Sequence, residues 1–300
     1  MPLRTRARNL ALKAASRLRL HELALSLQRG RANSRIVVVE MHETPDAVEL
    51  RQQIEWVAEH FTIITPELFA RALETRTGTW PGSKPAVLFT FDDGRESNYL
   101  VAAPLLESFN ARGIFFVVTE FIGLQGDAAK DYYYSKIDIR KTQRTTANRG
   151  ESQPADAEDE IWMPMRPSQL ADLVRRGHWV GSHTLSHARL AGISPADLQR
   201  EIRDSADQIA LWTGNPAEAF AWPYSWNSID RASWQAVQQS HCFCFSPCPG
   251  TVDLANDSSL LIWRKEIESR YSPAEYRFMY SGLVDLLWAK RRRALGRMLA

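Results

Sequence analysis

Two short segments of the sequence carry side chains that could perform chemistry together. The first is Asp92-Asp93-Gly94, which directly follows an apolar run at residues 86–91. Two adjacent carboxylates at the end of a strand point in different directions, so one could bind a metal ion while the other acts as a base. The alternative is an ordinary Asp-rich turn in which Gly94 supplies the left-handed residue.

The second segment contains two histidines, His183 and His187, separated by three residues. This spacing lets both imidazoles converge on one ion if the segment is helical or turn-like. Two solvent-facing or capping histidines are the alternative. Two histidines and one carboxylate form a typical ligand set for Zn²⁺, or for Fe²⁺, Co²⁺ or Mn²⁺, with positions left for water and substrate. A metal site is therefore predicted if the fold brings both segments together.

The surrounding sequence predicts how that could happen. Apolar runs that indicate strands alternate with segments that indicate helices. The strands are expected at residues 36–39, 61–64, 86–91, 114–118, 178–180, 219–222, 242–245 and 260–263, and the helices at 47–60, 65–73, 98–110, 168–176, 195–213 and 228–239. This alternation predicts an α/β fold whose parallel strands are covered by outer helices.

Polar residues repeatedly follow the predicted strands. They are His42, Asp92, Asp93, His183, His187 and, directly after Pro223, Tyr224. In parallel α/β folds the carboxyl ends of the strands form the edge at which sites are built. The sequence therefore places the candidate ligands at one edge of the sheet.

Longer motifs around these residues resemble the polysaccharide deacetylase family, also called the NodB-homology or carbohydrate esterase family 4 domain. Residues 90–94 (TFDDG), followed by Asn98-Tyr99 and the run at 113–117, are similar to its first signature. Residues 177–187 (GHWVGSHTLSH) resemble its second. The resemblance covers roughly residues 36–265. It implies a distorted (β/α) barrel with fewer than eight regular strands.

The resemblance also assigns roles to the two segments. Asp93, His183 and His187 match the family's metal ligands. Asp92 matches the catalytic base. The expected cofactor is a divalent metal, with Zn²⁺ first and Co²⁺, Fe²⁺, Mn²⁺ or Ni²⁺ as alternatives.

The third family signature is only partly present. Residues 220–225 read FAWPYS, and Ala221 stands where many members have an Arg that orients the catalytic Asp. A subgroup that also lacks this Arg has a similar aromatic-Pro-Tyr form, which implies that the backbone N–H of Tyr224 stabilises the oxyanion. Arg264, in a late strand, is our candidate for a substitute partner of Asp92. A solvent-exposed surface Arg is the alternative.

The usual C-terminal Leu-x-His signature is absent, because no histidine follows His241. In the poly-N-acetylglucosamine deacetylase subgroup, a histidine after the first strand is the general acid, and His42 has the matching place. An ordinary loop histidine is the alternative.

Three residues in and beside the third signature are candidates for binding the sugar: Trp222, Pro223 and Trp226. Tryptophan rings provide flat surfaces for stacking. Core packing is the alternative, since it accounts for most tryptophans.

The resulting hypothesis is a metal-dependent hydrolase that uses metal-activated water to remove an N-acetyl or related acyl group. Its substrate would be a sugar, a polysaccharide or a lipid-linked glycan. Three alternatives stay open: a catalytically impaired glycan- or metal-binding relative, a deformylase or other amide hydrolase, and a de-O-acetylase.

Bulk properties restrict the location and partners. The net charge of +2 gives no ground for nucleic-acid binding. No apolar run has the length of about 18 residues that a membrane span needs, and no apolar signal segment follows the basic start. Three clustered cysteines do not predict a disulfide framework. We therefore expect a cytoplasmic protein. An organellar transit peptide is the alternative for the Arg-rich, acid-poor start.

The chain divides into three expected parts. Residues 1–35 form a basic N-terminal helical extension, residues 36–270 form the catalytic domain with a charged insertion at 126–164, and residues 271–300 form a basic C-terminal helix. The basic ends could rest on an anionic membrane as a peripheral contact. A solvated charged face, or contact with a partner chain, is the alternative.

Overall fold

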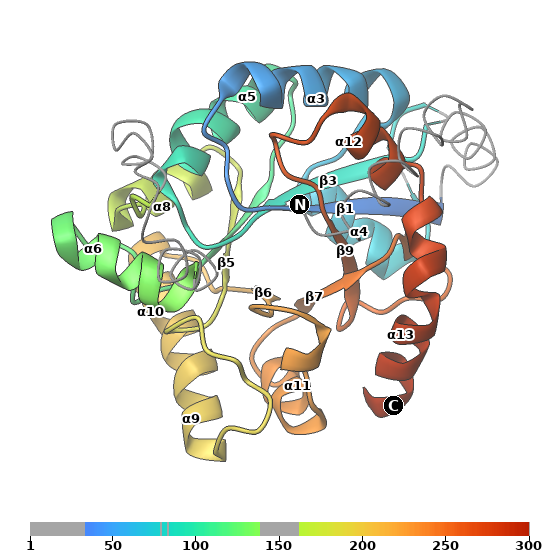
Figure 1. Ribbon diagram of the computed structural model, residues 1–300. Coiled ribbons are helices and arrows are strands. Elements are labelled where there is room, and N and C mark those ends of the chain that lie inside the picture. The colour runs from blue at the N-terminus through green and yellow to red at the C-terminus, as the bar shows by residue number, and fades with distance from the viewer. Residues whose placement is uncertain (1–33, 79, 83, 139–161, 300) are drawn as a thin grey trace, which may run out of the picture.

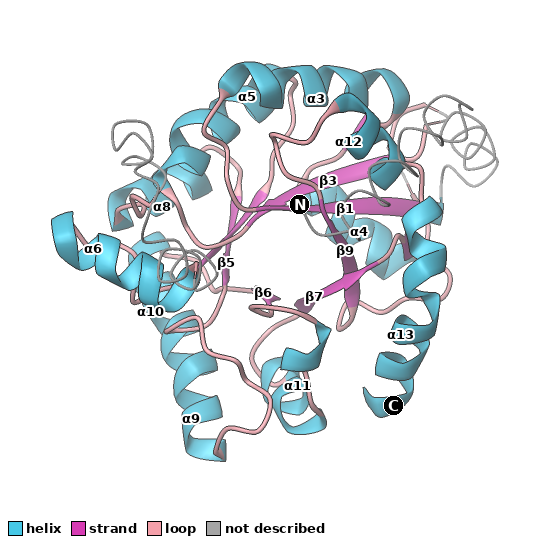
Figure 2. Ribbon diagram, viewed as in Figure 1, coloured by secondary structure: helices cyan, strands magenta, loops and turns pink. Residues whose placement is uncertain are grey.

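A computed structural model describes residues 34–78, 80–82, 84–138 and 162–299. Most of the basic N-terminal extension expected at residues 1–35 and most of the charged insertion expected at 126–164 lie outside these ranges. In the described part, helices form an outer ring around a central ring of strands (Figures 1 and 2).

The strands close into a barrel. Its seven parallel strands in the described ranges are β1 (Arg35–Met41), β3 (Ala86–Phe91), β4 (Ile114–Val117), β5 (Trp179–Ser182), β6 (Ala219–Ala221), β7 (Phe243–Pro249) and β9 (Ile262–Glu266). Closure occurs where β1 pairs in parallel with both β9 and β3. The short strand β2 (Thr62–Ile63) pairs with the start of β3, and β8 (Val252–Asp253) pairs antiparallel with β1. The predicted distorted (β/α) barrel is confirmed.

The helices follow the predicted alternation closely. They are α3 (Ala47–His60), α4 (Pro66–Thr75), α5 (Ala103–Ser108), α6 (Gly126–Tyr132), α8 (Pro167–Arg175), α9 (Pro195–Gln199), α10 (Ser205–Thr213), α11 (Arg231–Gln238), α12 (Pro273–Tyr280) and α13 (Leu283–Leu299). A π-helical turn over Arg200–Asp204 joins α9 to α10, which gives the long helix expected at 195–213. None of the described helices is both long and apolar enough to cross a membrane.

The structure corrects two of these expectations. The single C-terminal helix predicted for residues 271–300 is two helices, because Ser281 and Gly282 separate α12 from α13 and Gly282 adopts a left-handed φ of 78°. The strand predicted at 178–180 is β5, which begins and ends later, so Gly181 and Ser182 belong to the strand rather than to the following loop.

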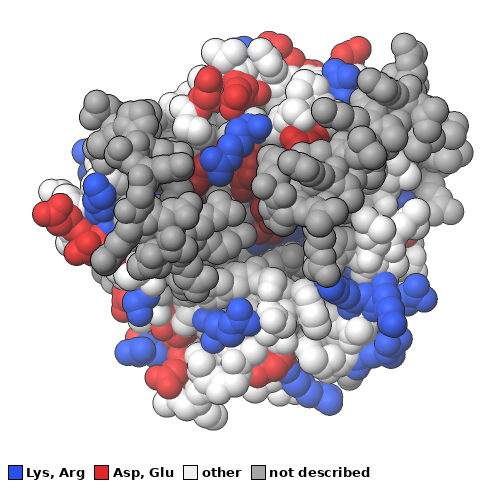
Figure 3. Space-filling view, viewed as in Figure 1, with Lys and Arg blue, Asp and Glu red and all other residues white. Residues whose placement is uncertain are grey.

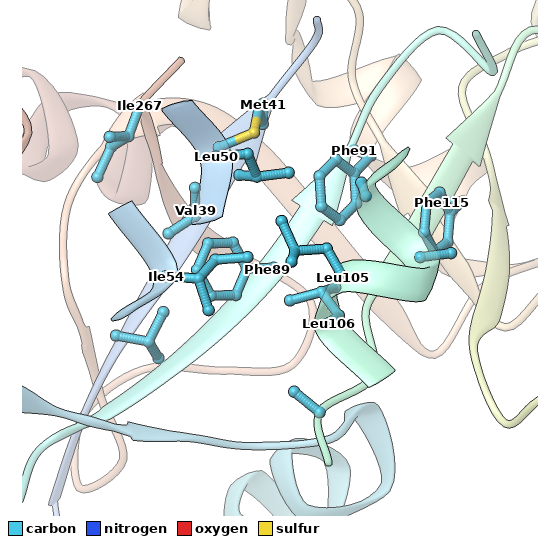
Figure 4. Close-up of a cluster of buried hydrophobic side chains, with 14 of the residues drawn as sticks. Val39, Met41, Leu50, Ile54, Phe89, Phe91, Leu105, Leu106, Phe115 and Ile267 are labelled. Atoms are coloured by element: carbon cyan, nitrogen blue, oxygen red, sulfur yellow. The ribbon is translucent and has the colours of Figure 1, made fainter. Parts of the chain in front are cut away.

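Alternation along the strands divides their side chains between two cores. Val39 and Met41 of β1 and Phe89 and Phe91 of β3 point outward, where they meet helices (Figure 4). Their helical partners include Leu50 and Ile54 of α3 and Leu105 and Leu106 of α5. The intervening residues, such as Val38 and Leu88, fill the barrel with Phe116 and Phe245. Both faces are apolar, as expected for strands buried on two sides.

The same alternation determines which polar groups point into the barrel. Glu40 follows Val38 by two residues, and Asp92 follows the inward Thr90 by two. Arg264 follows the inward Ile262 in β9 by the same step. Charged side chains therefore point into the barrel at its carboxyl end, just beyond the apolar residues that fill its interior.

Gly181 in β5 lies at a tightly packed point of this interior. A Cβ atom there would lie 2.6 Å from the Phe116 ring and 2.7 Å from the carbonyl oxygen of Ala219. The oxygen belongs to the neighbouring strand β6 and cannot move without disturbing the barrel. Glycine at this position therefore lets β5 and β6 approach each other.

Replacing Gly181 by Ala should lower the free energy of unfolding by about 1–3 kcal/mol, the usual cost of overpacking a tight interior. Urea unfolding measures the change. Gly296→Ala is the control, because a Cβ at that helical position meets nothing within 4 Å, and alanine favours the helix. Equal stability of Gly181→Ala and the original chain would contradict this packing.

Candidate active site

The three predicted metal ligands come together at the carboxyl end of the barrel. Asp93 follows β3, whereas His183 and His187 lie in the loop between β5 and α9. One ligand atom from each residue lies within 4.8 Å of the others. Asp93 Oδ1 is 3.8 Å from His183 Nε2 and 3.7 Å from His187 Nε2. All three side chains are buried.

Hydrogen bonds turn the Nε2 atom of each histidine toward Asp93. His183 Nδ1 lies 2.8 Å from the carbonyl oxygen of Ala221, and His187 Nδ1 lies 2.9 Å from that of Lys136. Because a carbonyl oxygen only accepts, each Nδ1 carries the proton and each Nε2 keeps its lone pair. Burial lowers the pKa of His183 to about 4, and burial also lowers the pKa of His187. Both imidazoles are therefore neutral near pH 7, as metal ligands must be.

Lys136 belongs to the predicted insertion, whose described beginning is ordered around the site. It lies in a π-helical turn, Tyr133–Ile137, that directly continues α6. The Tyr133 ring packs below the Arg95 guanidinium at 4.8 Å. The start of the insertion thus fixes the ring of His187 and helps to enclose Asp93.

The backbone around the site is strained. Six non-glycine residues in the described ranges have a positive φ, and four of them are Asp93 (75°), Thr184 (70°), His187 (60°) and Tyr224 (65°). Such conformations cost about 1–3 kcal/mol each and persist only where surrounding contacts enforce them. Their concentration here indicates that the loops are shaped to aim particular groups.

Asp92 forms a buried ion pair with Arg264. Arg264 Nη1 donates to Asp92 Oδ1 at 2.7 Å, and Nη2 donates to Oδ2 at 2.8 Å. Arg264 is 0% exposed, so it is not the solvent-exposed arginine that the sequence left open. Burial alone would raise the pKa of Asp92, but attraction to Arg264 outweighs it and holds this pKa below its usual value. Asp92 is therefore ionised near pH 7, with Oδ2 at 3.8 Å from His183 Nε2.

His42 is paired with a carboxylate that the sequence analysis missed. Its Nδ1–H donates to Glu268 Oε1 at 2.7 Å, and its backbone N–H donates to Glu268 Oε2 at 3.2 Å. Burial opposes protonation of His42, but its attraction to and hydrogen bond with Glu268 raise the pKa well above the usual value. His42 is therefore protonated near pH 7, and its ring stays partly exposed.

Two further charged residues complete the site. Arg95 Nη2 donates to Asp93 Oδ2 at 2.9 Å, and attraction to Arg95 outweighs burial, which keeps the pKa of Asp93 below its usual value. Glu40 Oε2 lies 3.4 Å from Arg264 Nη2, and burial raises its pKa to about 7. Glu40 lies two residues after Val38, which faces the barrel interior, so the alternation of side chains along the strand could have identified it. Glu268 and Arg95 carry a weaker signal, since each only follows a strand end.

The charges of the buried residues around the site are nearly balanced. Five carboxyl groups are buried here, those of Glu40, Glu43, Asp92, Asp93 and Glu268. Opposite them lie two buried guanidinium groups, those of Arg95 and Arg264, and the imidazole of His42. Arg270 reaches Glu43 from the surface. Glu40 is partly protonated near pH 7, so the other four carboxylates and these four cationic groups balance. Asp93 and the two neutral imidazoles still offer one ligand atom each to a divalent cation.

The third-signature residues divide into exposed and buried ones. The partly exposed Tyr224 places its ring 4.7 Å from that of His187. Trp226 is also partly exposed, at the start of a 3₁₀ turn, Trp226–Ser228. Pro223 is buried. Trp222 is 1% exposed and packs edge-on against Phe220, so the predicted sugar-stacking surface at Trp222 is wrong. Its side chain belongs to a core cluster between the barrel and the helices.

Comparison with known sequences yields a family match. A sequence model described as polysaccharide deacetylase matches residues 79–241, more than half of the chain. YxkH of Bacillus subtilis (strain 168), named as a polysaccharide deacetylase, is 22% identical over 158 residues. That alignment covers 52% of this chain and 42% of YxkH, so the chain spans less than half of that relative's length.

Solved structures share the barrel. IcaB from Ammonifex degensii has 17% identity and a TM-score of 0.60, covering 83% of this chain and 96% of that one. The Streptococcus pyogenes deacetylase PplD, in complex with acetate, has 18% identity and a TM-score of 0.58 over 83% and 98%. A de-N-acetylase from Aggregatibacter actinomycetemcomitans has 15% identity and a TM-score of 0.59 over 82% and 99%. At these identities the likeness establishes the fold.

The family match contains both segments from which the site is built, and the solved relatives share its barrel. On this evidence the chain belongs to the polysaccharide deacetylase family.

Proposed function

We propose that this protein is a metal-dependent hydrolase that removes an N-acetyl or related acyl group from a sugar of a glycan. One observation carries the proposal: an ionised carboxylate, Asp92, is held by Arg264 at 3.8 Å from a ligand atom of a three-residue cation site. Family membership supports the reaction class. So do the solved relatives that are described as deacetylases, one of them with acetate.

Asp93, His183 and His187 would hold the cation, for which Zn²⁺ suits the donor set and Co²⁺, Fe²⁺, Mn²⁺ or Ni²⁺ are alternatives. When bound there, such an ion supplies Lewis-acid polarisation of water and of the acyl oxygen. The neutral imidazoles and the depressed pKa of Asp93 leave all three groups ready to bind it at neutral pH.

Asp92 would act as the general base. Arg264 holds both carboxylate oxygens, yet each oxygen retains a second lone pair that can take a proton from the attacking water. The two parallel hydrogen bonds fix the plane of the carboxylate, so the base keeps one orientation. Arg264 thus fills the orienting role that Ala221 cannot, which weakens the reading of this chain as an inactive relative.

His42 would act as the general acid. Its raised pKa keeps it protonated near pH 7, and Glu268 fixes the orientation of its ring. Because the ring stays partly exposed, it can reach the amine that departs from the sugar. The backbone N–H of Tyr224 would stabilise the oxyanion, with the strained φ of 65° setting its direction. Trp226 remains the candidate for stacking against the sugar ring.

The reaction is tested by acetate release from N-acetylglucosamine oligomers, with metal content measured on the same samples. We expect release that stops after chelation and returns when Zn²⁺ or Co²⁺ is added. Asp93→Asn should lose both the bound metal and the activity, because it removes an anionic ligand. His60→Gln, a histidine on α3 outside the site, is the control. Full activity of Asp93→Asn after chelation would contradict the proposal.

The pairing of Arg264 with Asp92 is tested by unfolding. Arg264→Met leaves a buried carboxylate without its partner and should cost about 3–5 kcal/mol of unfolding free energy. Adding Asp92→Asn to that variant removes the uncompensated charge, so the double variant should recover a large part of the loss. Additive effects of the two substitutions in urea unfolding would show that the side chains do not interact.

The acid role of His42 is tested by the pH profile of acetate release. Glu268→Gln replaces an anion with a neutral amide, so the pKa of His42 should fall, because the attraction that raises it is lost. Because the acid must be protonated, the alkaline limb of kcat/KM should move to lower pH. Glu266→Gln, at an exposed position of the same strand, should leave the limb in place. An unchanged limb in Glu268→Gln would exclude His42 as the acid.

A further inference from the structure

The C-terminal helix α13 is firmly attached to the barrel by one side. The buried ammonium group of Lys265 in β9 pairs with Asp285 Oδ1 at 3.0 Å. Thr251 Oγ1 donates to the other carboxylate oxygen at 2.5 Å, and Arg292 Nη1 donates to the carbonyl oxygen of Pro249 at 2.6 Å. Apolar contacts complete this inner side through Val284, Leu295 and Leu299. The helix therefore presents a fixed outer face.

That outer face combines solvent-exposed leucines with basic residues. Leu286 is 75% exposed, Leu287 is 74% exposed and Met298 is 41% exposed. Four exposed basic residues share the face with them: Lys290, Arg291, Arg293 and Arg297. Lys and Arg side chains gather over α13 on the right of Figure 3. Single exposed leucines are ordinary, but two adjacent ones within a basic helical face form a surface of a particular kind.

Negative charge is confined to the inner side of this helix. Asp285 is the one acid in Leu283–Leu299, and it faces Lys265 and Thr251. The outer face consequently has no carboxylate of its own helix to neutralise its four basic groups. Its charge is complementary to an anionic surface.

The outer face adjoins the rim of the active site. The Arg291 guanidinium lies 4.5 Å from the Trp288 ring centre and 5.8 Å from that of Trp226. Trp226 lies two residues beyond Tyr224, whose ring contacts His187. Tryptophan and arginine at the edge of such a face suit the boundary between lipid headgroups and water.

We propose that the outer face of α13 docks onto the surface of an anionic phospholipid membrane. Leu286, Leu287 and Met298 enter the headgroup region, while the four basic residues contact lipid phosphates. Docking by this face holds the Trp226 side of the active-site rim close to the membrane. The surface is independent of the proposed reaction, because binding requires neither the cation nor Asp92.

The mixture of residues favours lipid over a soluble polyanion. A polyanion pairs with the basic groups and gains nothing from two exposed leucines, whereas a membrane removes their apolar surface from water. The two partners therefore differ in their dependence on Leu286 and Leu287.

Co-sedimentation of the full chain with vesicles tests the proposal. Binding is expected to vesicles of phosphatidylcholine mixed with phosphatidylglycerol, and to weaken without phosphatidylglycerol or at high salt. Leu286→Ser combined with Leu287→Ser should weaken binding roughly tenfold or more, since each leucine loses several apolar groups. Lys290→Gln combined with Arg293→Gln should weaken it by a similar factor.

Matched controls come from other helices. Leu211→Ser removes a leucine that is 78% exposed on α10, and Arg51→Gln with Arg71→Gln removes two exposed charges from α3 and α4. Neither control should change vesicle binding. Binding that depends on the basic residues of α13 but not on its leucines would indicate a polyanion site and overturn the proposal. Absence of binding, or binding that all α13 variants retain, would also overturn it.

Acetate release from a soluble oligomer is measured on the same variants. The α13 substitutions should leave this activity unchanged, because they touch neither the cation site nor its proton-transfer groups. A loss of vesicle binding with intact activity therefore concerns the membrane surface alone.

Discussion

A guanidinium group that is closed inside a barrel must be paired, because its desolvation is costly unless an anion compensates for it. Arg264 is such a group. It rises from β9 above the Phe116 ring, with their centres 5.4 Å apart, and both of its terminal nitrogens hold Asp92. Barrel closure brings β9 beside β1 and within reach of β3, so this pairing depends on the whole ring of strands. The orientation of Asp92 is therefore a consequence of the fold.

The surrounding site follows from the same requirement. Asp93 is ionised beside Arg95, Glu268 beside His42, and Glu40 lies within reach of both Arg264 and His42. These pairs surround the place where two neutral imidazoles point toward Asp93. The strained backbone at Asp93, His187 and Tyr224 is held in place by the hydrogen bonds and packing around it. The candidate cation site and the proposed base thus share one network of buried charges.

Local patterns in the sequence predicted much of this. The strand at 86–91 and the helix at 47–60 have the predicted bounds, because the apolar pattern of each segment is a local property of the sequence. The family motifs brought Asp92, Asp93, His183 and His187 together correctly as a cluster. The partners of these residues were harder to predict. Glu268 meets His42 across 226 positions of the chain, and no local pattern records such a contact. The prediction for Trp222 was wrong because the alternation of side chains in a short strand does not show which helices cover each face of that strand.

The central claim is that Asp93, His183 and His187 hold a divalent cation beside an ionised Asp92. X-ray absorption spectroscopy of the full chain loaded with one equivalent of Zn²⁺ tests it most directly. The site described here predicts two imidazole nitrogens at about 2.0–2.1 Å and carboxylate or water oxygens at about 2.0–2.2 Å. In the His183→Ala variant one imidazole should disappear from the spectrum. Sulfur scattering, or a spectrum without imidazole, would contradict the account.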